Sequence, residues 1–232
     1  MRYTWLHPFS LAFPPADRTD RYGVVALGGD LSPERILKAY ALGIFPWFNS
    51  GDPIMWWCPD PRFVLYPDEL KVAKSMRPYF NQRKYRVTYD THFRDVMTAC
   101  GQIERPGQRG GTWISEDMID AYVQVHELGY AHSVEVWQDE TLVGGLYGIA
   151  LGKVFFGESM FMRAPNASKF GFITLVRRLR AQGYTLVDCQ QPTRHLASLG
   201  ARSISRADFL EHLRANEKEA SVSGRWQAEA DE

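Results

Sequence analysis

Three apolar segments follow one another between residues 131 and 161 with only short turns between them. The segments are 131–137, 141–150 and 153–161, and the turns are Gln138-Asp139-Glu140 and Leu151-Gly152. Connections this short join antiparallel neighbours, because parallel strands need a longer crossover. The sequence therefore predicts a meander of three strands.

Helix signals lie on both sides of this meander. Ser115 is a good N-cap residue, apolar residues recur at helical spacing as far as Glu127, and Gly129 can end the helix. The other expected elements are a strand over 85–89, helices over 93–100 and 167–182, a strand over 184–189 and helices starting near Thr193 and Ser205. This order, β-α-α-β-β-β-α-β-α with one more helix at the end, predicts an α+β fold.

The first part of the chain differs in composition from the rest, because it is rich in proline and aromatic residues. One helix is expected there, since Ser32 can cap it and Pro33 suits its first position. Closely spaced prolines after it indicate a rigid, irregular segment. We therefore expect a small N-terminal domain over 1–64 and a second domain over 65–232, with the polar residues from about 216 frayed.

The composition excludes several classes of protein. Apolar residues make up 45% and charged residues 23% of the 232 residues, which is typical of a folded globular protein. Basic and acidic residues each number 27, so the zero net charge excludes a uniformly basic coat for nucleic acid but allows a local patch. Three widely spaced cysteines favour a reducing compartment. Since no apolar run reaches the roughly 18–20 residues that span a bilayer, we expect a cytoplasmic protein without a membrane segment.

Asp188 and Gln190 lie at the end of an expected strand, where alternation places them on one face and Cys189 on the other. A carboxylate and an amide side by side can orient an amine and polarise a carbonyl. The alternative is a polar strand end whose groups satisfy one another. A nucleophile and base made of Cys189 and His195 is disfavoured, because a buried cysteine usually serves as a small apolar residue.

Glu158 is a charged residue inside the apolar run Phe155–Phe161. Burying such a charge is costly unless the charge is paired or functional. Gly157 beside it predicts a bulge or the close approach of another segment. The carboxylate could therefore bind a cationic group of a substrate, or it could form a structural ion pair.

No metal or phosphate site is predicted. His126 and His132 are six positions apart, and no Asp, Glu or Cys completes a metal-binding spacing with them. Gly28-Gly29-Asp30 and Gly144-Gly145 lack the lysine and the further glycine that phosphate loops require. We therefore expect neither a metal nor a cofactor.

A run of cations lies between Leu70 and Tyr89 without an intervening acid. It consists of Lys71, Lys74, Arg77, Arg83, Lys84 and Arg86. This basic run could contact phosphates, or it could be a solvated helix face. Trp47, in a proline-framed loop, and Trp113 could stack on a nucleobase, although core packing is the default for aromatic residues.

Eight short segments occur in order along the chain. They are Ala26–Pro33, Gly43–Phe48, Trp56–Arg62, Gly111–Ile114, His126–Gly129, Gly157–Phe161, Asn166–Lys169 and Asp188–Gln190. Together they resemble the bacterial leucyl/phenylalanyl-tRNA–protein transferase family. The resemblance runs from about Phe13 to about Gly200, and it is specific because the segments are collinear.

The resemblance implies a fold and an activity. The fold would be a small N-terminal α/β domain followed by a GNAT-like domain, similar to acyl-CoA N-acyltransferases, with a mostly antiparallel sheet. The activity would be that of an aminoacyltransferase that moves Leu or Phe, and less readily Met, from aminoacyl-tRNA to a protein with an N-terminal Arg or Lys. The product would be marked for degradation by the N-degron pathway. We expect a monomer that needs no cofactor.

The resemblance also implies roles for individual residues. Asp188 and Gln190 would act on the incoming α-amino group, and Glu158 would lie close by as a binding group for the acceptor. Trp47 and Trp113 would hold the terminal adenosine of the tRNA, and the basic run would contact its acceptor arm. The pocket for the aminoacyl side chain would be lined by Leu146, Phe155, Phe172, Leu175 and Val187.

The sequence is compatible with more than one role for Asp188 and with two other functions. An ordinary Asp, with a pKa of about 3.9, is a poor base for an amine, so Asp188 could orient Gln190 instead, unless burial raises its pKa. A CoA-dependent GNAT N-acyltransferase is disfavoured, because Met162–Lys169 lacks a glycine-rich cradle for pyrophosphate. A non-catalytic tRNA-binding protein would keep the tryptophans and the basic run but would not need Glu158 beside the other two residues.

Overall fold

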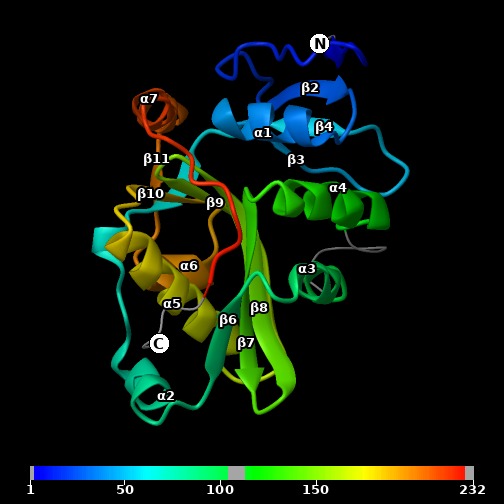
Figure 1. Cartoon of the computed structure of the whole chain (residues 1–232). Helices are drawn as coiled ribbons and strands as arrows, with labels where there is room; N and C mark the ends of the chain where they lie inside the picture. Colours follow the sequence, from blue (N-terminus) through cyan, green and yellow to red (C-terminus); the bar gives the residue numbers. More distant parts are fainter. Residues whose placement is uncertain (1–2, 104–112, 228–232) are drawn as a thin grey trace.

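A computed structural model of the chain describes residues 3–103 and 113–227, which form two β-sheets with helices packed against them (Figure 1). The smaller sheet has the strand order β1-β2-β4-β3, and the larger sheet has the order β11-β5-β10-β9-β8-β7-β6. The predicted α+β class is confirmed. Gly111 and Thr112, which belong to the Gly111–Ile114 segment, lie outside the described residues.

The N-terminal unit is the smaller sheet with one helix. Its strands are β1 (Trp5–Leu6), β2 (Val24–Gly28), β3 (Phe45–Pro46) and β4 (Met55–Trp57). Helix α1 (Pro33–Ala41) begins where Ser32 and Pro33 predict it, although the Ser32 side chain makes no capping hydrogen bond. The sequence does not predict these strands, because they have only two to five residues and are too short to show an alternating pattern.

The meander predicted over 131–161 is confirmed, and it forms part of the larger sheet. Strands β7 (Ala131–Gln138), β8 (Thr141–Leu151) and β9 (Val154–Met162) pair antiparallel with one another. Strand β6 (Arg86–Tyr89) pairs antiparallel with β7 on the outer side. Strands β6 to β9 therefore form one continuous antiparallel part of the larger sheet.

The other half of the larger sheet joins segments that are distant in sequence. Strand β10 (Leu186–Gln190) runs parallel to β9 and antiparallel to β5 (Arg62–Leu65), and β11 (Arg202–Ile204) pairs antiparallel with β5. The sequence predicts neither β5 nor β11. The domain boundary expected between residues 64 and 65 falls inside β5.

Helices cover both faces of the larger sheet (Figure 1). Helices α3 (Phe93–Gly101) and α4 (Glu116–Glu127) contribute to one hydrophobic cluster, and α5 (Ala167–Ala181) contributes to another together with opposite-facing residues of the same strands. The shorter helices are α2 (Arg77–Asn81), α6 (Arg194–Ser198) and α7 (Arg206–Asn216), with 3-10 turns at Pro67–Glu69 and Lys74–Met76. Within the described residues, no helix has the length and apolar character that crossing a bilayer would require.

The C-terminal segment after α7 contacts the fold at particular residues. Its polar composition predicts fraying from about 216, and most of residues 217–227 are exposed. The Trp226 ring stacks on His132, with ring centroids 3.9 Å apart and planes 6° apart. The Trp226 backbone N–H donates to Asp90 at 2.6 Å, and the Gly224 N–H donates to the Gly129 carbonyl at 3.1 Å. One aromatic anchor and backbone hydrogen bonds therefore order this segment, while residues 228–232 lie outside the described part of the chain.

Replacing Trp226 with alanine should destabilise the protein, because stacking on His132 and packing against Phe155 would be lost. We expect the free energy of unfolding to fall by about 2–4 kcal/mol, as for truncation of a large packed side chain. Urea unfolding measures this, and Val222→Ala, at an exposed position of the same segment, is the matched control. Equal stability of the two variants would contradict the docking of the segment.

Candidate active site

Strands β9 and β10 part from each other in the middle of the larger sheet. Their ladder pairs Leu186–Asp188 with Val154–Phe156 and then ends. Each strand is irregular at this point, because Glu158 is skipped in the pairing of β9 with β8 and Cys189 is skipped in the pairing of β10 with β5. The bulge predicted beside Gly157 is therefore confirmed. Because each strand has a bulge where the ladder ends, side chains there can point toward residues outside the strand pairing.

Glu158 is bound by donors from three different elements. The Tyr40 hydroxyl, on α1, donates to Glu158 Oε1 at 2.6 Å, and the Gln190 side-chain amide donates to the same oxygen at 2.7 Å. The Tyr122 hydroxyl, on α4, lies 3.4 Å from Oε2 and 2.6 Å from the Tyr40 hydroxyl. Within the described part of the chain, Glu158 forms no ion pair. The structural ion pair considered for this carboxylate is thus not formed by those residues.

Burial raises the pKa of Glu158 from its ordinary 4.5 to about 7. The hydrogen bonds from Tyr40, Gln190 and Tyr122 lower this pKa, while the charge of Asp188 raises it further. Burial and the neighbouring carboxylate also raise the pKa values of Tyr40 and Tyr122 well above their ordinary range, so both hydroxyls stay protonated. A carboxyl group with a pKa near neutrality can hold or release a proton at physiological pH.

Asp188 is paired with a buried arginine. The Arg62 Nε donates to Asp188 Oδ1 at 2.8 Å, and Nη2 donates to Oδ2 at 2.6 Å. Both side chains are fully buried. Burial alone would lower the pKa of Arg62, but the charge and hydrogen bonds of Asp188 raise it above its ordinary value. A two-pronged contact of this kind fixes the plane of the carboxylate as well as its charge.

Gln190 connects Asp188 to Glu158. Its backbone is left-handed, with a φ of 59°, which is uncommon for a residue other than glycine. The Gln190 backbone N–H donates to Asp188 Oδ1 at 2.9 Å, and the side chain reaches Glu158. The structure therefore brings together the three polar residues that the sequence pattern singles out, while their catalytic roles stay predictions.

Cys189 is not arranged as a nucleophile. Burial, with a further contribution from the charge of Asp188, raises the pKa of its thiol far above the ordinary value. The side chain packs against the hydrophobic cluster that contains Phe155. Because the thiolate is the reactive form of cysteine, this environment favours the interpretation of Cys189 as a small apolar residue.

Three residues of the site are not predicted by the sequence: Arg62, Tyr40 and Tyr122. The two tyrosines recur at helical spacing and are therefore interpreted as core residues. The feature that could have predicted a polar role is the hydroxyl group of each tyrosine, because a buried tyrosine hydroxyl needs a hydrogen-bond partner. Arg62 carries no such local signal, since its partner Asp188 lies 126 positions away.

The residues expected to line a side-chain pocket lie in one hydrophobic cluster between the larger sheet and α5. They are Leu146, Phe155, Phe172, Leu175 and Val187. None of the five is more than 3% exposed, so they are core residues in this structure. A Cβ on Gly157 would lie 4.0 Å from the Phe155 ring. The cluster therefore begins directly behind the bulge that carries Glu158.

Trp47 and Trp113 differ in exposure. Trp47 is 40% exposed, and its carbonyl oxygen accepts a hydrogen bond from the Trp57 indole nitrogen at 2.6 Å. The Trp47 and Trp57 rings are tilted against each other with centroids 5.6 Å apart. Trp113 is 7% exposed and packs in the cluster that contains Tyr122. Trp47 is thus accessible to a flat ligand, whereas Trp113 is largely covered.

All the side chains of the basic run are exposed. Across residues 3–103 and 113–227, none of them forms an ion pair with a carboxylate. They lie on a loop, a 3-10 turn, α2, a second loop and β6, so they do not form the single helix face considered above. Helix α2 lies at the end of the molecule opposite the N-terminal unit (Figure 1).

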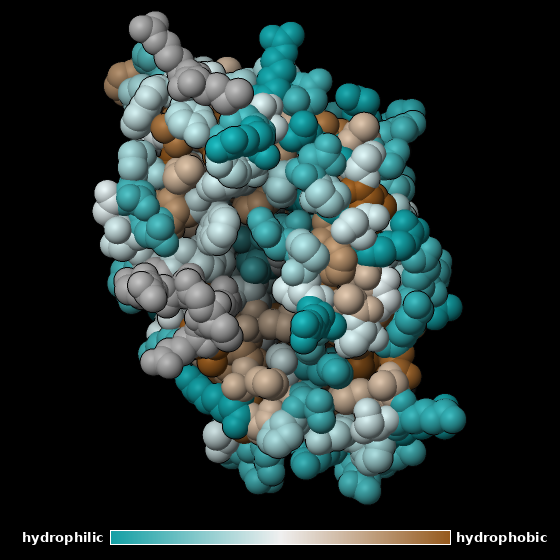
Figure 2. Space-filling model, turned by 180° about the vertical axis from the view of Figure 1, so that it is seen from behind, coloured by the Kyte–Doolittle hydropathy of each residue, from teal (hydrophilic) through white to brown (hydrophobic). Residues whose placement is uncertain are grey.

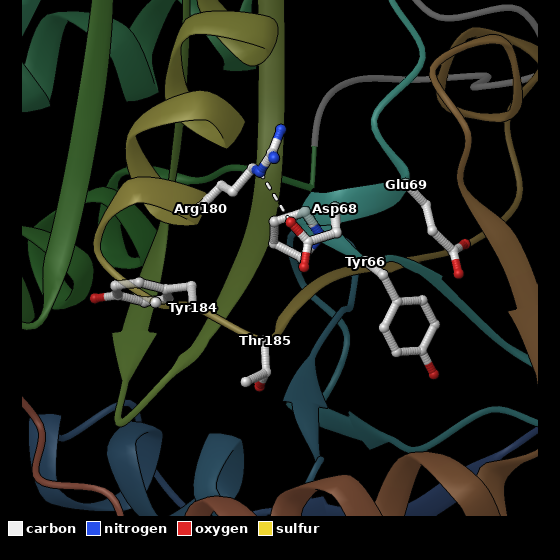
Figure 3. Close-up of a pocket in the computed structure, with 8 residues that line it drawn as sticks. Tyr66, Asp68, Glu69, Arg180, Tyr184 and Thr185 are labelled. Atoms are coloured by element: carbon white, nitrogen blue, oxygen red, sulfur yellow. Dashed lines mark ion pairs between the residues drawn. The ribbon is translucent and has the colours of Figure 1, made fainter.

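The surface is hollowed in more than one place. Figure 2 shows a hollow near the centre of the face behind the view of Figure 1, with hydrophilic residues at its bottom. A separate hollow of about 420 Å³ is bordered by Tyr66, Tyr184 and an ion pair of 2.8 Å between Arg180 and Asp68 (Figure 3). This second hollow shares no residue with the hydrogen-bonded site at the split between β9 and β10, so it is a different feature of the surface.

The two histidines considered for a metal site have protein partners. His132 Nδ1 lies 2.8 Å from Asp90 Oδ2, and His126 Nδ1 lies 2.7 Å from the Ala131 carbonyl. Burial lowers the pKa of His132, against the opposing effect of Asp90. In the part of the chain that the structure describes, no group of three or more His, Cys, Asp and Glu side chains could hold a metal ion.

Comparison with known proteins places the chain in a family. A family model described as leucyl/phenylalanyl-tRNA protein transferase matches residues 64–214, and one for the N-terminal domain of the same proteins matches residues 29–60. A curated leucyl/phenylalanyl-tRNA–protein transferase from Myxococcus xanthus is 55% identical over 92% of this chain and 91% of its own length. A relative of the same name from Flavobacterium johnsoniae is 56% identical over 88% of this chain and 96% of its own length. Among solved structures, a GCN5-related N-acetyltransferase from Kribbella flavida aligns with a TM-score of 0.36 and 10% identity over 73% of this chain and 60% of that chain.

The extent of these matches defines the chain as an enzyme of the aminoacyltransferase class. It belongs to the leucyl/phenylalanyl-tRNA–protein transferase family. Glu158, Asp188 and Gln190 lie within residues matched by the larger family model, and Tyr40 lies within those matched by the smaller one. The candidate site is therefore built from both matched regions.

Replacing Glu158 with glutamine should change how stability depends on pH. The pKa in the folded protein, about 7, is higher than the ordinary 4.5, so the folded protein binds this proton more tightly than the unfolded chain does. The parent protein should therefore lose up to roughly 3 kcal/mol of stability as the pH rises from 4.5 to 7, and Glu158→Gln should not.

Urea unfolding of both proteins at pH 5 and pH 8.5 measures this difference. Glu140→Gln, at an exposed position, is the matched control and should follow the parent. If the stability of Glu158→Gln depends on pH as that of the parent does, then the pKa of Glu158 is not raised in the folded protein.

Proposed function

We propose that the chain transfers Leu or Phe, and less readily Met, from aminoacyl-tRNA to the α-amino group of an N-terminal Arg or Lys of an acceptor protein. The product carries a new N-terminal residue that marks it for degradation by the N-degron pathway. The observation that carries the proposal is the hydrogen-bonded series Asp188, Gln190 and Glu158 at the split between β9 and β10. Family membership supports the same activity.

The proposed transfer is driven by its donor, because aminoacyl-tRNA is an activated ester. The acceptor nitrogen attacks the ester carbonyl carbon, a C–N bond forms, and the C–O bond to the ribose breaks. The ribose oxygen leaves with the proton that the amine loses. Since an α-amine has a pKa of about 7.7–8, a useful fraction is neutral near pH 7, and correct placement of the two reactants can lower the barrier by several kcal/mol.

Glu158 would bind the cationic acceptor. Its carboxylate is held by neutral donors, without a counter-ion among the described residues, and its pKa of about 7 reflects that environment. A guanidinium or ammonium group of the acceptor would supply the missing positive charge and favour the ionised carboxylate. This complementarity is consistent with an N-terminal Arg or Lys as the acceptor.

Gln190 would position the amine, and Asp188 would hold Gln190 in place. Asp188 Oδ1 accepts hydrogen bonds from both Arg62 and the Gln190 backbone, and Oδ2 accepts one from Arg62. A carboxylate whose two oxygens are engaged by these donors is better suited to fixing geometry than to removing a proton. Of the two roles left open by the sequence, we therefore propose orientation.

The donor would be held by apolar and aromatic contacts. Trp47 offers an exposed ring to the terminal adenosine, and Trp113 would contribute to the same site. The side chain of the donor amino acid would enter the cluster of Leu146, Phe155, Phe172, Leu175 and Val187 behind Glu158. Packing discriminates a methylene by about 1–3 kcal/mol, so shape would select against β-branched residues incompletely.

The basic run would contact the phosphates of the tRNA acceptor arm. Its cations are exposed and have no carboxylate partner in the described residues, so they are available to an external anion. Phosphate contacts make affinity depend strongly on salt concentration. We further propose that the enzyme is a cytoplasmic monomer whose partners are aminoacyl-tRNA and proteins with N-terminal Arg or Lys.

A transfer assay tests the proposal directly. The protein is incubated with tRNA charged with labelled Leu and with a peptide that begins with Arg, and we expect the label on the peptide. A peptide with an acetylated N-terminus is the control and should stay unlabelled. Acetyl transfer from acetyl-CoA without Leu transfer would favour a CoA-dependent acyltransferase, and tRNA binding without either reaction would favour a binding protein.

Replacing Trp47 with alanine should weaken use of the charged tRNA, because a stacking surface for the adenosine would be lost. Stacking on an aromatic side chain contributes about 1–3 kcal/mol per base, so we expect the KM for charged tRNA to rise about fivefold or more. Steady-state transfer kinetics measure this. Trp5→Ala, which removes another exposed tryptophan, should leave KM unchanged, and equal effects of the two substitutions would argue against a stacking role.

A further inference from the structure

Strand β5 contributes one residue, Arg62, to the candidate site. Arg62 is fully buried and forms both hydrogen bonds of its fork to Asp188. In the register of the sheet, Asp188 is paired with Val64, so the Arg62 side chain reaches along the strand to meet the carboxylate. The contact therefore depends on the orientation of a long side chain rather than on direct strand pairing.

Two aromatic rings fix that orientation. The Arg62 guanidinium carbon lies over the Phe45 ring at 4.7 Å from its centroid and over the Phe209 ring at 4.5 Å. Phe45 belongs to the smaller sheet, and Phe209 belongs to α7. A guanidinium stacked on aromatic rings keeps its charge and loses freedom of rotation. Arg62 is thus held by the N-terminal unit and by the C-terminal helix at once.

The contact between Arg62 and Asp188 also affects the backbone of Gln190. The oxygen that accepts from Arg62 Nε also accepts from the Gln190 backbone N–H, at 2.8 Å and 2.9 Å respectively. That second hydrogen bond supports the left-handed backbone of Gln190, a conformation that usually persists only where surrounding contacts impose it. Without Arg62, the buried Asp188 carboxylate would lose its counter-charge and both hydrogen bonds of the fork, and the Gln190 backbone N–H alone would not fix its plane.

We propose that Arg62 is a positioning residue for the transfer reaction. It locks Asp188 in the orientation from which Asp188 holds the Gln190 backbone, and so it sets where the Gln190 amide stands relative to Glu158. This role rests on the proposed function. Lysine could supply the positive charge at this position, but its ammonium group cannot make the planar two-pronged contact.

A purely structural role makes a different prediction. If Arg62 only stabilised the fold, then Arg62→Lys would lower stability without changing the turnover of the folded protein. A positioning role instead predicts a fall in kcat with little change in KM, because the binding surfaces for tRNA and acceptor are left in place. The split between kcat and KM therefore separates the two roles.

Arg35 provides a matched control for this comparison. It is also fully buried and forms an ion pair, with Asp30 at 3.0 Å, and it donates to the Ser10 carbonyl at 2.9 Å. These contacts lie within the N-terminal unit, away from the split between β9 and β10. The Asp30 side chain is 43% exposed, whereas Asp188 is fully buried. Arg35→Lys should therefore cost some stability, less than Arg62→Lys, without disturbing Gln190.

The experiment measures transfer kinetics and urea unfolding for the parent, Arg62→Lys and Arg35→Lys. We expect Arg62→Lys to lower kcat about 100-fold, the effect of misplacing a reacting group by about 1 Å, with KM values within about threefold of the parent. Arg35→Lys should keep the parent's kcat. A folded Arg62→Lys with parental kcat, or an equal loss of kcat in Arg35→Lys, would overturn the proposed role.

A double variant covers the case in which Arg62→Lys does not fold. Arg62→Met combined with Asp188→Asn removes both charges and leaves no buried charge unpaired, so it should fold. We expect its kcat to equal that of Asp188→Asn alone, because the two residues act as one unit. A double variant with parental kcat, or one clearly slower than Asp188→Asn, would overturn a role of Arg62 that acts through Asp188. If the parent itself transfers no Leu, the proposed function fails and this role fails with it.

Discussion

Arg62 and Asp188 carry opposite charges, and both side chains are fully buried. Neither could be buried alone, because an unpaired charge in the protein interior would have to neutralise or draw water inward. The pair lies where β5 meets β10, and the Arg62 guanidinium also lies over rings from β3 and α7. These four elements must therefore assemble together, and the candidate site forms at the place where they do.

The two acidic residues of the site have opposite electrostatic environments. Asp188 faces a guanidinium, whereas Glu158 is held by hydroxyl and amide donors and has a pKa of about 7. Two carboxyl groups in one site commonly have different functions when their surroundings differ in this way. The contrast supports a fixed structural charge at Asp188 and a carboxylate at Glu158 that responds to a cationic ligand. The N-terminal unit is part of this site, because Tyr40, on α1, donates to Glu158 and Phe45, on β3, lies against Arg62.

Short sequence patterns predict those elements that are determined by residues close together in the sequence. Strands β7, β8 and β9 are long and joined by short turns, so their order and pairing follow from the sequence. The bulge at Glu158 also follows, because a glycine beside a charge in an apolar strand marks a place where the regular ladder is interrupted. The same logic places Asp188 and Gln190 at a strand end, with the role of each still to be tested.

Other parts depend on contacts between residues that are distant in sequence. The pairing of Arg62 with Asp188 and the approach of Tyr40 to Glu158 span 126 and 118 positions, so no local pattern can reveal them. The strands of the N-terminal unit are too short to alternate visibly. The docked C-terminal segment is polar apart from a few residues, and the stacking of Trp226 on His132 is a tertiary contact that composition does not predict.

A crystal structure of the protein with puromycin, a mimic of an aminoacyl-adenosine, would test whether Gln190 and Glu158 form the transfer site. We expect its aminoacyl carbonyl within hydrogen-bond reach of the Gln190 side chain, with the adenosine ring against Trp47 and the amino-acid side chain directed toward Phe155. Binding elsewhere, such as the hollow beside Tyr66 and Tyr184, with no contact to Gln190 or Glu158, would contradict this assignment of the site.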